Sequence, residues 1–553
     1  MSEDTADPVA LGIMWDRLVA VADDVLTAIV RTAFSVGVRE AWDLACVVFD
    51  ERGRSIAQAR LSMPAFIGTA PLTMRHMLRA IPAETLVPGD VLVTNDPWHG
   101  TGHTPDICVA RPVFHQGRLV GFVMTITHLP DIGGAGLAIS NPDLFHEGLI
   151  LPVCKLHEAG EPNALIYEII RRNVRIVDEV FGDIEANVSG TAVGARLVTE
   201  FMDEYGLEDL RPLAEAIIQR SRDAIADALS AVEGGTYTNT VDVEAIDDTV
   251  RLSAAVTIRG GTAAIDFAGT GPMVKAAINV PLCYTRAFAT FALKCLTTPN
   301  IPNNEGTRAP LKVAAPEGSI LNAARPSPVG GRHTVGWFIV PLIFGALAQV
   351  LPGRVQADSG MASLMLVSGR APGGRSFVTQ YFLAGGLGAM DGKDGQHTVP
   401  FPTNNAVVPS EVWERETGLR VLHRRLLADS GGPGAWRGGL GQEVAMRNET
   451  GGDVHFSIFG LRTRFAAQGL AGGGDGIPRR FAIDGREIPA KGRVALREGE
   501  TLTIREAGGG GFGDPAARPL DAIAADIAGG FVTLGQAQSV YGVRQGGDGV
   551  LVR

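Results

Sequence analysis

Two apolar runs rich in β-branched residues, 107–114 and 119–127, are joined through His115 and the short polar segment Gln116, Gly117 and Arg118. Runs of this composition that are joined by a short glycine-containing segment are typical of a β-hairpin. If the loop consists of those three residues, residue 115 lies opposite residue 119, and Asp106 then lies directly opposite His128. The hairpin therefore predicts which polar side chains meet at its open end.

The surrounding stretch, residues 87–134, concentrates ionisable side chains near that open end. It holds four of the eleven histidines, His99, His103, His115 and His128, with Asp96, Asp106 and Asp131 interleaved. Directly paired residues have Cβ atoms about 4.5–5.5 Å apart, so Asp106 and His128 could share one divalent ion. His103, three residues before Asp106, could close over the same point.

Histidine and aspartate without cysteine suit Zn²⁺, Mn²⁺ or Fe²⁺ rather than a structural thiolate zinc site. An ion that keeps an open coordination position can polarise a carbonyl or activate water. The alternative is that these side chains only cap turns and bind loop backbone, because the spacing of His103 and Asp106 is common by chance. His99 is a weaker candidate, and His115 is expected to be solvated beside the turn.

Length and composition indicate a large α+β protein with several domains. A chain of 553 residues is consistent with two to four domains, and its 70 glycines fall mostly in short clusters that are typical of turns. We predict an N-terminal metal-binding α+β domain (1–234), a central α+β domain (235–400) and a β-rich C-terminal domain (401–553) that ends in a short helix. The N-terminal half is expected to be helical and hairpin-rich, and the C-terminal half β-rich.

Hydrophobic periodicity predicts the individual elements. Helices are expected over 9–37, 72–81, 163–234, 281–298, 333–351 and 519–528, followed by a tail over 532–543. Strands are expected over 44–49 and 55–58 as a hairpin, then over 149–156, within 236–268, and over 363–368, 377–383, 420–427, 442–448 and 454–459.

Charge and segment composition exclude several classes of function. The net charge of −11 and the absence of a Lys/Arg stripe argue against a nucleic-acid partner. No run of 18 apolar residues predicts a membrane span, and the acidic N-terminus lacks the order of a signal peptide, so a cytoplasmic protein is expected. The five cysteines are scattered without a CxxC pair, which predicts buried, inert thiols.

Common nucleotide and hydrolase motifs are absent from the sequence. It contains no GxxxxGK[ST] phosphate loop, GxSxG elbow or HExxH motif. The glycines at 438–441 and 508–513 lack the strand–GxGxxG–helix context of a dinucleotide site, so we interpret them as points where backbones crowd together. If ATP is used, this chain is not expected to bind it alone.

An ordered set of motifs resembles the hydantoinase B/oxoprolinase family over nearly the whole chain. It begins with Asn95-Asp96-Pro97-Trp98, Gly102-His103-Thr104-Pro105-Asp106 and His128-Leu129-Pro130-Asp131-Ile132-Gly133-Gly134. It continues through Glu147-Gly148-Leu149, 301–306, 315–319, 429–434 and 437–441 to Gly510-Gly511-Phe512-Gly513-Asp514-Pro515.

The resemblance implies the metal-bearing subunit of an ATP-dependent complex. In this family a hydantoinase A-type partner binds ATP and phosphorylates a substrate oxygen, which implies a hetero-oligomer such as a heterotetramer. The family's metal ligands correspond to His103, Asp106 and His128. Asp43 resembles an additional aspartate of the hydrolase branch, so Asp43 is a fourth ligand or a base that orients water, and Asp43 and His128 are the candidate catalytic residues.

The implied reaction is ring-opening hydrolysis of a cyclic amide or imide, as in N-methylhydantoinase and 5-oxoprolinase. The alternatives are carboxylation of a ketone, as in acetone and acetophenone carboxylases, and a non-catalytic scaffold subunit. One departure bears on the substrate, because residues 62–68 replace a histidine-containing stretch of many hydrolase members. His146 and Glu147 could supply polar groups instead, or could form a plain loop.

Overall fold

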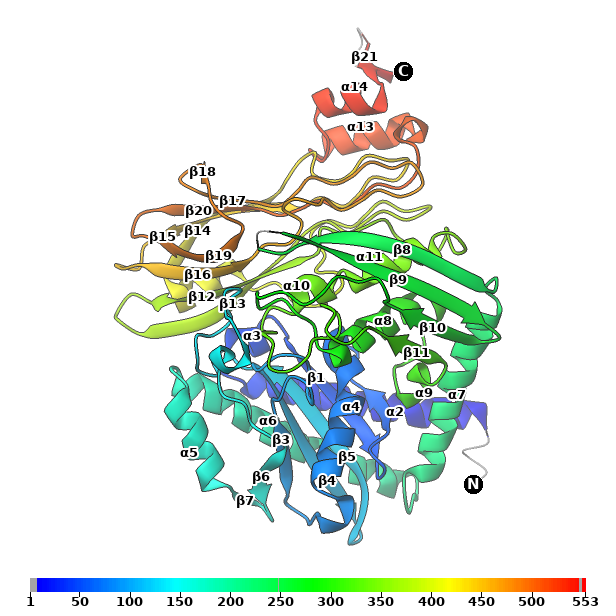
Figure 1. Cartoon of the computed structure of the whole chain (residues 1–553), viewed down its shortest axis with the longest axis vertical. Coiled ribbons are helices and arrows are strands. Elements are labelled where there is room, and N and C mark those ends of the chain that lie inside the picture. Colours follow the sequence, from blue (N-terminus) through cyan, green and yellow to red (C-terminus); the bar gives the residue numbers. More distant parts are fainter. Residues whose placement is uncertain (1–6, 247, 547–549) are drawn as a thin grey trace. The chain divides into compact units, whose positions relative to one another are not determined.

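A computed structural model of the chain describes residues 7–246, 248–546 and 550–553. The chain is divided into two compact units (Figure 1). Unit 1 comprises residues 1–239 and 253–343, and unit 2 comprises residues 240–252 and 344–553. Helices and mostly antiparallel sheets occur together in the chain, so the predicted α+β class is confirmed. The predicted division into three domains stays a prediction.

A seven-stranded antiparallel sheet forms the centre of unit 1, in the order β2-β1-β5-β4-β3-β6-β7. Its strands are β1 (Leu44–Asp50), β2 (Ser55–Gln58), β3 (Val91–Thr94), β4 (Asp106–His115), β5 (Arg118–His128), β6 (Cys154–Glu158) and β7 (Glu161–Pro162). The central strands are buried along almost their whole length, because helices pack on the sheet and most side chains of these strands are apolar. β6 begins later than predicted, after Pro152, whose missing N–H cannot join the ladder.

The predicted hairpin is β4–β5, and its register at the open end is confirmed. Asp106 pairs with His128 and Val113 with Gly121. The turn is one residue shorter than predicted, because only Gln116 and Gly117 form it, and both have positive φ as the favoured two-residue hairpin turn requires. A bulge between Val113 and Phe114 restores the predicted pairing for the rest of the hairpin.

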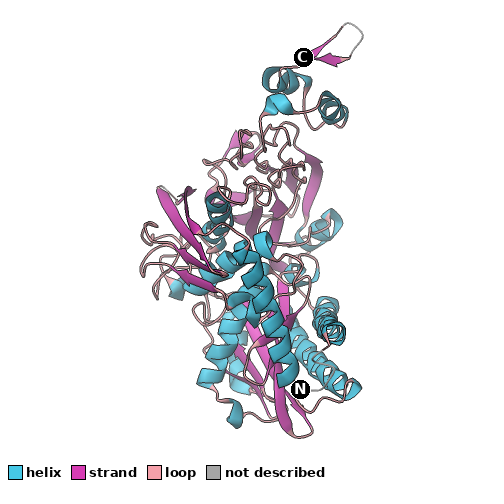
Figure 2. Cartoon of the chain, turned by 90° about the vertical axis from the view of Figure 1, so that its right-hand side faces the viewer, coloured by secondary structure: helices cyan, strands magenta, loops and turns pink. Residues whose placement is uncertain are grey.

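Helices pack beside the strands of this sheet (Figure 2), and α2, α4, α6 and α7 contact its strands. The helices between residues 8 and 347 are α2 (Pro8–Thr32), α3 (Val36–Arg39), α4 (Pro64–Ala80), α5 (Ala164–Asn173), α6 (Val177–Glu204), α7 (Arg211–Ser230), α8 (Leu282–Thr297), α9 (Glu305–Arg308), α10 (His333–Gly336) and α11 (Ile339–Leu347). Short 3₁₀ turns occur at η1 (Ala83–Thr85) and η2 (Leu144–Glu147). The apolar faces of α2, α6 and α7 pack against β1, β2 and β5 in one continuous aliphatic core.

Proline and capping residues explain where the predicted helices were wrong. α4 starts at Pro64 and continues through Pro71, because its buried face packs so closely on α8 that a Cβ on Gly68 would lie 2.4 Å from the Cβ of Ala287. The helix predicted over 333–351 is two shorter helices, since Pro341 cannot donate a hydrogen bond to the preceding turn. The helix predicted over 9–37 breaks where Ser35 caps α3.

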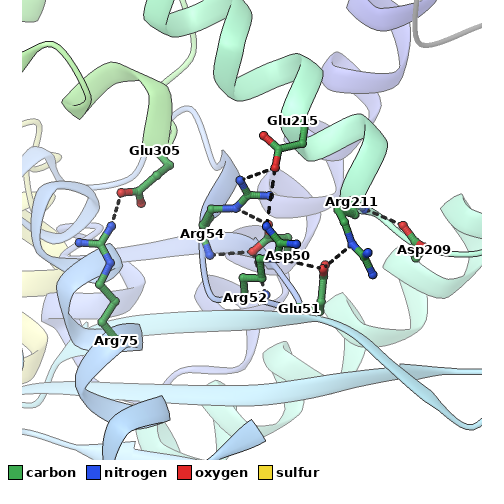
Figure 3. Close-up of polar contacts among 9 residues, drawn as sticks. All are labelled: Asp50, Glu51, Arg52, Arg54, Arg75, Asp209, Arg211, Glu215 and Glu305. Atoms are coloured by element: carbon green, nitrogen blue, oxygen red, sulfur yellow. Dashed lines mark hydrogen bonds and ion pairs between the residues drawn. The ribbon is translucent and has the colours of Figure 1, made fainter. Parts of the chain in front are cut away.

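Charged side chains tie the tip of the β1–β2 hairpin to α7 (Figure 3). Arg54 Nε donates to Asp50 Oδ2 at 2.7 Å, and Arg54 Nη1 donates to Glu215 Oε1 at 2.8 Å. Arg211 Nε donates to Glu51 Oε1 at 3.0 Å. These contacts hold β1 at its Asp50 end. The opposite end of β1 directly follows Asp43, a candidate site residue.

A second sheet has the order β11-β10-β9-β8 and confirms the strands predicted within 236–268. Its members are β8 (Gly235–Glu244), β9 (Thr249–Arg259), β10 (Thr262–Asp266) and β11 (Leu311–Ala314). Buried and exposed residues alternate along β9 and β10, as expected where one face of a sheet is packed.

Unit 2 contains two further sheets, in the orders β13-β12-β16-β19 and β14-β15-β20-β17-β18. The strands are β12 (Ala362–Arg370), β13 (Ser376–Ala384), β14 (Leu419–Leu426), β15 (Gln442–Asn448), β16 (Val454–Phe459), β17 (Arg480–Ile483), β18 (Arg486–Glu487), β19 (Lys491–Leu496) and β20 (Thr501–Arg505). The five strands predicted between 363 and 459 are therefore confirmed.

Glycine-rich segments of unit 2 stack their backbones directly on one another. A Cβ on Gly508 would lie 1.7 Å from the carbonyl oxygen of Ser430, and a Cβ on Gly438 would lie 2.0 Å from that of Gly509. Gly509 N donates to Gly439 O, and Gly432 N donates to Gly509 O. The interpretation of both glycine runs as backbone crowding points is confirmed.

The remaining elements of unit 2 are α12 (Ser410–Thr417), η3 (Pro515–Ala517), α13 (Leu520–Ala528), α14 (Leu534–Tyr541) and the small hairpin β21 (Arg544–Gln545) and β22 (Leu551–Val552). α13 was predicted, whereas α14 falls in the segment predicted as a tail. Thr533 caps α14 and Gly542 ends it with positive φ, two signals that could have identified it. No helix in the described ranges has the length and apolar character that a membrane span requires.

Candidate metal centre

The structure brings His103, Asp106 and His128 together at the open end of the β4–β5 hairpin. Asp106 is the first residue of β4, His128 is the last residue of β5, and His103 lies in the loop before β4. Their potential ligand atoms all lie within 4.8 Å of one another, and all three residues are buried. Asp106 Oδ1 lies 2.8 Å from His103 Nε2 and 2.9 Å from His128 Nδ1.

His103 presents a nitrogen lone pair toward Asp106. Its Nδ1 lies 2.9 Å from the carbonyl oxygen of Gly330, which can only accept, so Nδ1 carries a proton. Burial lowers the pKa of His103 to about 4, and the positive charge of Arg332 acts in the same direction, so the ring is neutral and Nε2 is unprotonated. Nε2 forms no hydrogen bond within the described part of the chain despite its closeness to the carboxylate.

The second oxygen of Asp106 is held by Arg332 and Thr101. Arg332 Nη2 donates to Asp106 Oδ2 at 2.6 Å, and the Thr101 hydroxyl donates to the same oxygen. Arg332 Nε also donates to Thr101 O at 2.7 Å, and its guanidinium lies 4.3 Å above the ring centroid of Tyr284. Gly102 has a φ of +98°, and a Cβ there would lie 2.6 Å from Arg332 Cδ. A residue with a side chain would therefore displace the arginine.

Its neighbours keep Asp106 ionised although it is fully buried. Burial alone would raise the pKa of Asp106, but the positive charge of Arg332 and the hydrogen bond with His128 hold that pKa well below the usual value. Burial and the charge of Arg332 also keep the pKa of the neighbouring His333 well below its usual value. The centre therefore places an ionised carboxylate beside the neutral imidazole of His103.

Asp43 lies at the edge of this cluster. Its Oδ2 is 3.9 Å from His128 Nδ1, and its carbonyl oxygen accepts a hydrogen bond from His128 N at 3.1 Å. The preceding Trp42 has a φ of +58°, a conformation that turns the chain sharply into β1. Burial raises the pKa of Asp43 to about 6, although the neighbouring His128 opposes this shift. The role of Asp43 as a fourth ligand or base stays a prediction.

The donor set fits a divalent metal ion. Two imidazoles and one carboxylate, all buried, are the ligand types that zinc, manganese and iron accept. A bare Nε2 facing a carboxylate oxygen at 2.8 Å without a hydrogen bond would be repulsive unless a cation lies between them. The hydrogen bond of His103 Nδ1 to a carbonyl is also the arrangement that commonly orients a metal-ligating histidine.

Other residues of the histidine-rich stretch have structural partners instead. Asp96 pairs with Arg325 at 2.6 Å, and Asp131 pairs with Arg175 at 2.6 Å. The ring of His99 stacks on that of His76, with centroids 4.4 Å apart. The prediction that His115 is solvated is wrong, because the residue is 9% exposed and its Nε2 lies 2.8 Å from Oδ1 of Asp203 on α6.

Sequence reasoning missed most of the residues that surround the three candidate ligands. Gly330, Arg332 and His333 lie in one segment about 200 residues downstream, Gly330-Gly331-Arg332-His333-Thr334, for which hydrophobic periodicity predicts only the start of a helix. The signal available in the sequence was the charged Arg332, which stands between two glycines and the start of an apolar run. Of the pair 146–147, His146 is exposed beside Asp143, whereas Glu147 is buried and contacts Gly330.

The cysteines do not contribute to the centre. Cys46, Cys108 and Cys283 are buried, whereas Cys154 and Cys295 are half-buried, and all five are free thiols. Burial raises the pKa of each of the five thiols. They are therefore protonated at neutral pH, in agreement with the prediction of inert thiols.

Comparison with known proteins decides the family. The hydantoinase B/oxoprolinase family model matches residues 7–515. The chain belongs to this family. A protein of Pseudomonas sp. (strain NS671), named as a proposed B-type component of a D-/L-hydantoinase, is 29% identical over 97% of this chain and 95% of its own length.

Two solved structures share the fold of this hydantoinase B/oxoprolinase family chain. The crystal structure of an ATP-dependent caprolactamase from Pseudomonas jessenii superposes with a TM-score of 0.89 and 26% identity, covering 98% of this chain and 97% of that one. A nucleotide-free acetone carboxylase structure has a TM-score of 0.90 at 21% identity, covering 99% and 81% of the two chains. At that identity the second likeness shows the fold alone.

Proposed function

We propose that this chain is the metal-bearing subunit of an ATP-dependent complex that hydrolyses a cyclic amide or imide, with ring opening of the hydantoin or 5-oxoproline type. The observation that carries the proposal is the buried cluster of His103, Asp106 and His128, whose potential ligand atoms all lie within 4.8 Å of one another. Membership of the hydantoinase B/oxoprolinase family and the names of the hydantoinase and caprolactamase relatives support the hydrolytic reaction.

His103, Asp106 and His128 would hold a divalent ion, and zinc, manganese and iron all suit these donors. Such an ion supplies Lewis acidity toward a carbonyl and toward water. Asp43 is the residue placed to hold a proton beside the centre, because its carboxylate is buried, has a pKa of about 6 and lies 3.9 Å from His128 Nδ1. Arg332 keeps Asp106 ionised and oriented.

The proposed complex requires a second protein that binds ATP. This chain lacks the phosphate-loop motifs of an ATP site, and its glycine runs are filled by neighbouring backbone. A hydantoinase A-type subunit in a hetero-oligomer, such as a heterotetramer, would phosphorylate the amide oxygen. Phosphorylation would make the amide carbon more electrophilic, so that water adds to it. The ring C–N bond would then break as the nitrogen takes up a proton, and hydrolysis of the resulting acyl phosphate would release the carboxylate and inorganic phosphate.

Metal analysis of ligand variants tests the proposal directly. The full-length chain is expected to bind about one divalent ion, and His103→Ala and His128→Ala are expected to lower metal affinity by about 100-fold or more. His115→Ala is the matched control, because it removes a histidine from the other end of the same hairpin. Full metal content in both ligand variants would refute the site.

Turnover by the co-purified complex separates the possible reactions. We expect ATP-dependent ring opening of hydantoins, 5-oxoproline or a lactam, with no requirement for bicarbonate. Strict dependence on bicarbonate with a ketone substrate would instead establish a carboxylase. Wild-type turnover in complexes that carry His103→Ala would indicate a scaffold subunit.

A further inference from the structure

Glu147 is a buried glutamate that is linked through Gly330 to His103, the histidine whose Nε2 faces Asp106. Glu147 ends the 3₁₀ turn η2 and is 2% exposed. Its Oε1 accepts hydrogen bonds from Val329 N and Gly330 N, each at 2.7 Å. Its backbone carbonyl accepts from the Thr104 hydroxyl at 2.9 Å, so Glu147 is also anchored to the loop between His103 and Asp106.

Gly330 connects this carboxyl group to His103. Its N–H donates to Glu147, and its carbonyl oxygen accepts the proton of His103 Nδ1 at 2.9 Å. A Cβ on Gly330 would lie 3.1 Å from Glu147 Oε1, tighter than an ordinary van der Waals contact. The position of the Gly330 carbonyl therefore depends on the glutamate, and the protonation pattern of His103 depends on that carbonyl.

The Gly330 carbonyl determines which ring nitrogen of His103 keeps a free lone pair for a metal ion. A neutral histidine carries one ring proton, and a fixed acceptor beside Nδ1 leaves the lone pair on Nε2. If the 329–330 backbone shifted away, the proton could move to Nε2 and the donor atom facing Asp106 would be lost. Partners of this kind commonly change metal affinity by about 10–100-fold.

We propose that Glu147 is a positioning residue that acts through Gly330 to hold His103 with its unprotonated Nε2 toward the metal centre. The inference rests on the proposed metal site. Burial raises the pKa of Glu147 to about 8, so the group is largely neutral at pH 7 and adds no second negative charge beside Asp106. Glutamine, which keeps an acceptor oxygen, is then the conservative replacement.

The test measures metal binding by the full-length chain with Glu147→Ala and Glu147→Gln. Zinc affinity is measured by competition with a chromophoric chelator, and the visible absorption spectrum of the Co²⁺-loaded protein reports ligand geometry. We expect Glu147→Ala to weaken zinc binding by about 10–100-fold and to alter the Co²⁺ spectrum. We expect Glu147→Gln to retain affinity within about threefold and the wild-type spectrum, because Oε1 still has a counterpart.

Glu244 provides a matched control. This glutamate is 4% exposed, and its Oε1 accepts hydrogen bonds from three consecutive backbone N–H groups, those of Thr463, Arg464 and Phe465. Glu244→Ala therefore removes a comparable buried cap in unit 2. It is expected to lower the unfolding midpoint and to leave zinc affinity and the Co²⁺ spectrum unchanged.

The outcomes separate failure of the inference from failure of the metal site. If the wild-type chain binds zinc and His103→Ala does not, but Glu147→Ala matches wild type in affinity and spectrum, the positioning role is wrong. If His103→Ala binds zinc as wild type does, the metal site itself is wrong. Should Glu147→Ala fail to fold, Glu147→Asp replaces it, because the shorter side chain cannot span to both amides. Equal losses in Glu147→Gln and Glu147→Ala would also contradict the proposal.

Discussion

Each compact unit contains a deeply buried arginine–carboxylate pair, and the two pairs use their remaining hydrogen-bonding groups differently. In unit 1, Arg332 donates to Asp106 at 2.6 Å, and the other oxygen of Asp106 faces two imidazoles. In unit 2, Arg479 Nε donates to Glu506 at 2.6 Å, and its other nitrogens donate to four backbone carbonyls, those of Gly360, Met361, Ala362 and Leu461.

The contrast distinguishes a site from a structural support. Burial alone would raise the pKa of Asp106, but its neighbours keep that pKa well below the usual value. Burial raises the pKa of Glu506 even beside Arg479. A carboxylate that stays charged beside two imidazoles is suited to a cation. A guanidinium that binds the backbone carbonyls of residues 360–362 and 461 instead satisfies buried acceptors.

Removal of Arg479 should produce the largest effect on stability. Arg479→Leu leaves Glu506 buried without its cation and leaves four carbonyls without this donor, so we expect a loss of about 3–5 kcal/mol. The double variant Arg479→Leu/Glu506→Leu should recover part of that loss, because no unpaired charge remains. Denaturant unfolding followed by circular dichroism measures both. Equal midpoints for the single variant and wild type would show that the pair contributes nothing to stability.

The corresponding change in unit 1 should be rescued by metal. Arg332→Leu leaves Asp106 without its guanidinium, but a divalent cation bound at the centre would compensate the carboxylate. Zinc at 100 times its dissociation constant should therefore raise the stability of Arg332→Leu by about 2.7 kcal/mol. The same zinc concentration should not rescue Arg479→Leu beyond the gain seen in wild type. If zinc had no effect on the melting temperature of Arg332→Leu, the two pairs would be alike.

Part of the candidate site, namely the positions of His103, Asp106 and His128, could be predicted from local sequence patterns. Alternation along two strands and a short polar loop placed Asp106 opposite His128, and a bulge compensated for the turn being shorter than predicted. His103 followed from its spacing to Asp106. Strand identity and pairing are encoded within about 25 residues here, so a sequence pattern is sufficient.

The rest of the candidate site depends on contacts between distant segments. Arg332 lies 226 residues from Asp106 in sequence, and Gly330 lies 227 residues from His103. No periodicity reports such a contact, because tertiary packing rather than local propensity brings the segments together. The same reason explains α4, where burial against α8 overrides the expectation that Pro71 precedes the helix.

Two glycines extend the comparison to the backbone around each pair. A Cβ on Gly102 would lie 2.6 Å from Arg332 Cδ, and a Cβ on Gly360 would lie 2.2 Å from the carbonyl oxygen of Ala507. Alanine at either position should cost about 1–3 kcal/mol of stability. Only Gly102→Ala should also weaken zinc binding, because it displaces the arginine that orients Asp106. Unchanged zinc affinity in a folded Gly102→Ala protein would remove Arg332 from the site. Gly452→Ala, where a Cβ meets nothing within 4 Å, is the control.

The dependence of stability on pH should reveal Glu506 once its cation is removed. A carboxyl group whose folded-state pKa exceeds its unfolded value of about 4.5 binds more protons when folded, so its contribution to stability is greatest at low pH and is lost as pH rises through the folded pKa. Arg479→Leu should raise that pKa further. Its deficit relative to wild type should therefore be smaller at pH 5.5 than at pH 7.5, by at most about 1.4 kcal/mol for each pH unit.

The double variant Arg479→Leu/Glu506→Leu isolates this titration, because it lacks the carboxyl group and its stability should not show the fall with rising pH that Glu506 produces in Arg479→Leu. Unfolding midpoints of all three proteins across this range provide the measurement. Parallel pH profiles for Arg479→Leu and wild type would mean that water or another group neutralises Glu506 when the arginine is absent. The Arg479–Glu506 pair would then be as accessible to solvent as a surface ion pair. The two imidazoles that face Asp106 would be the one remaining difference between the pairs of the two units.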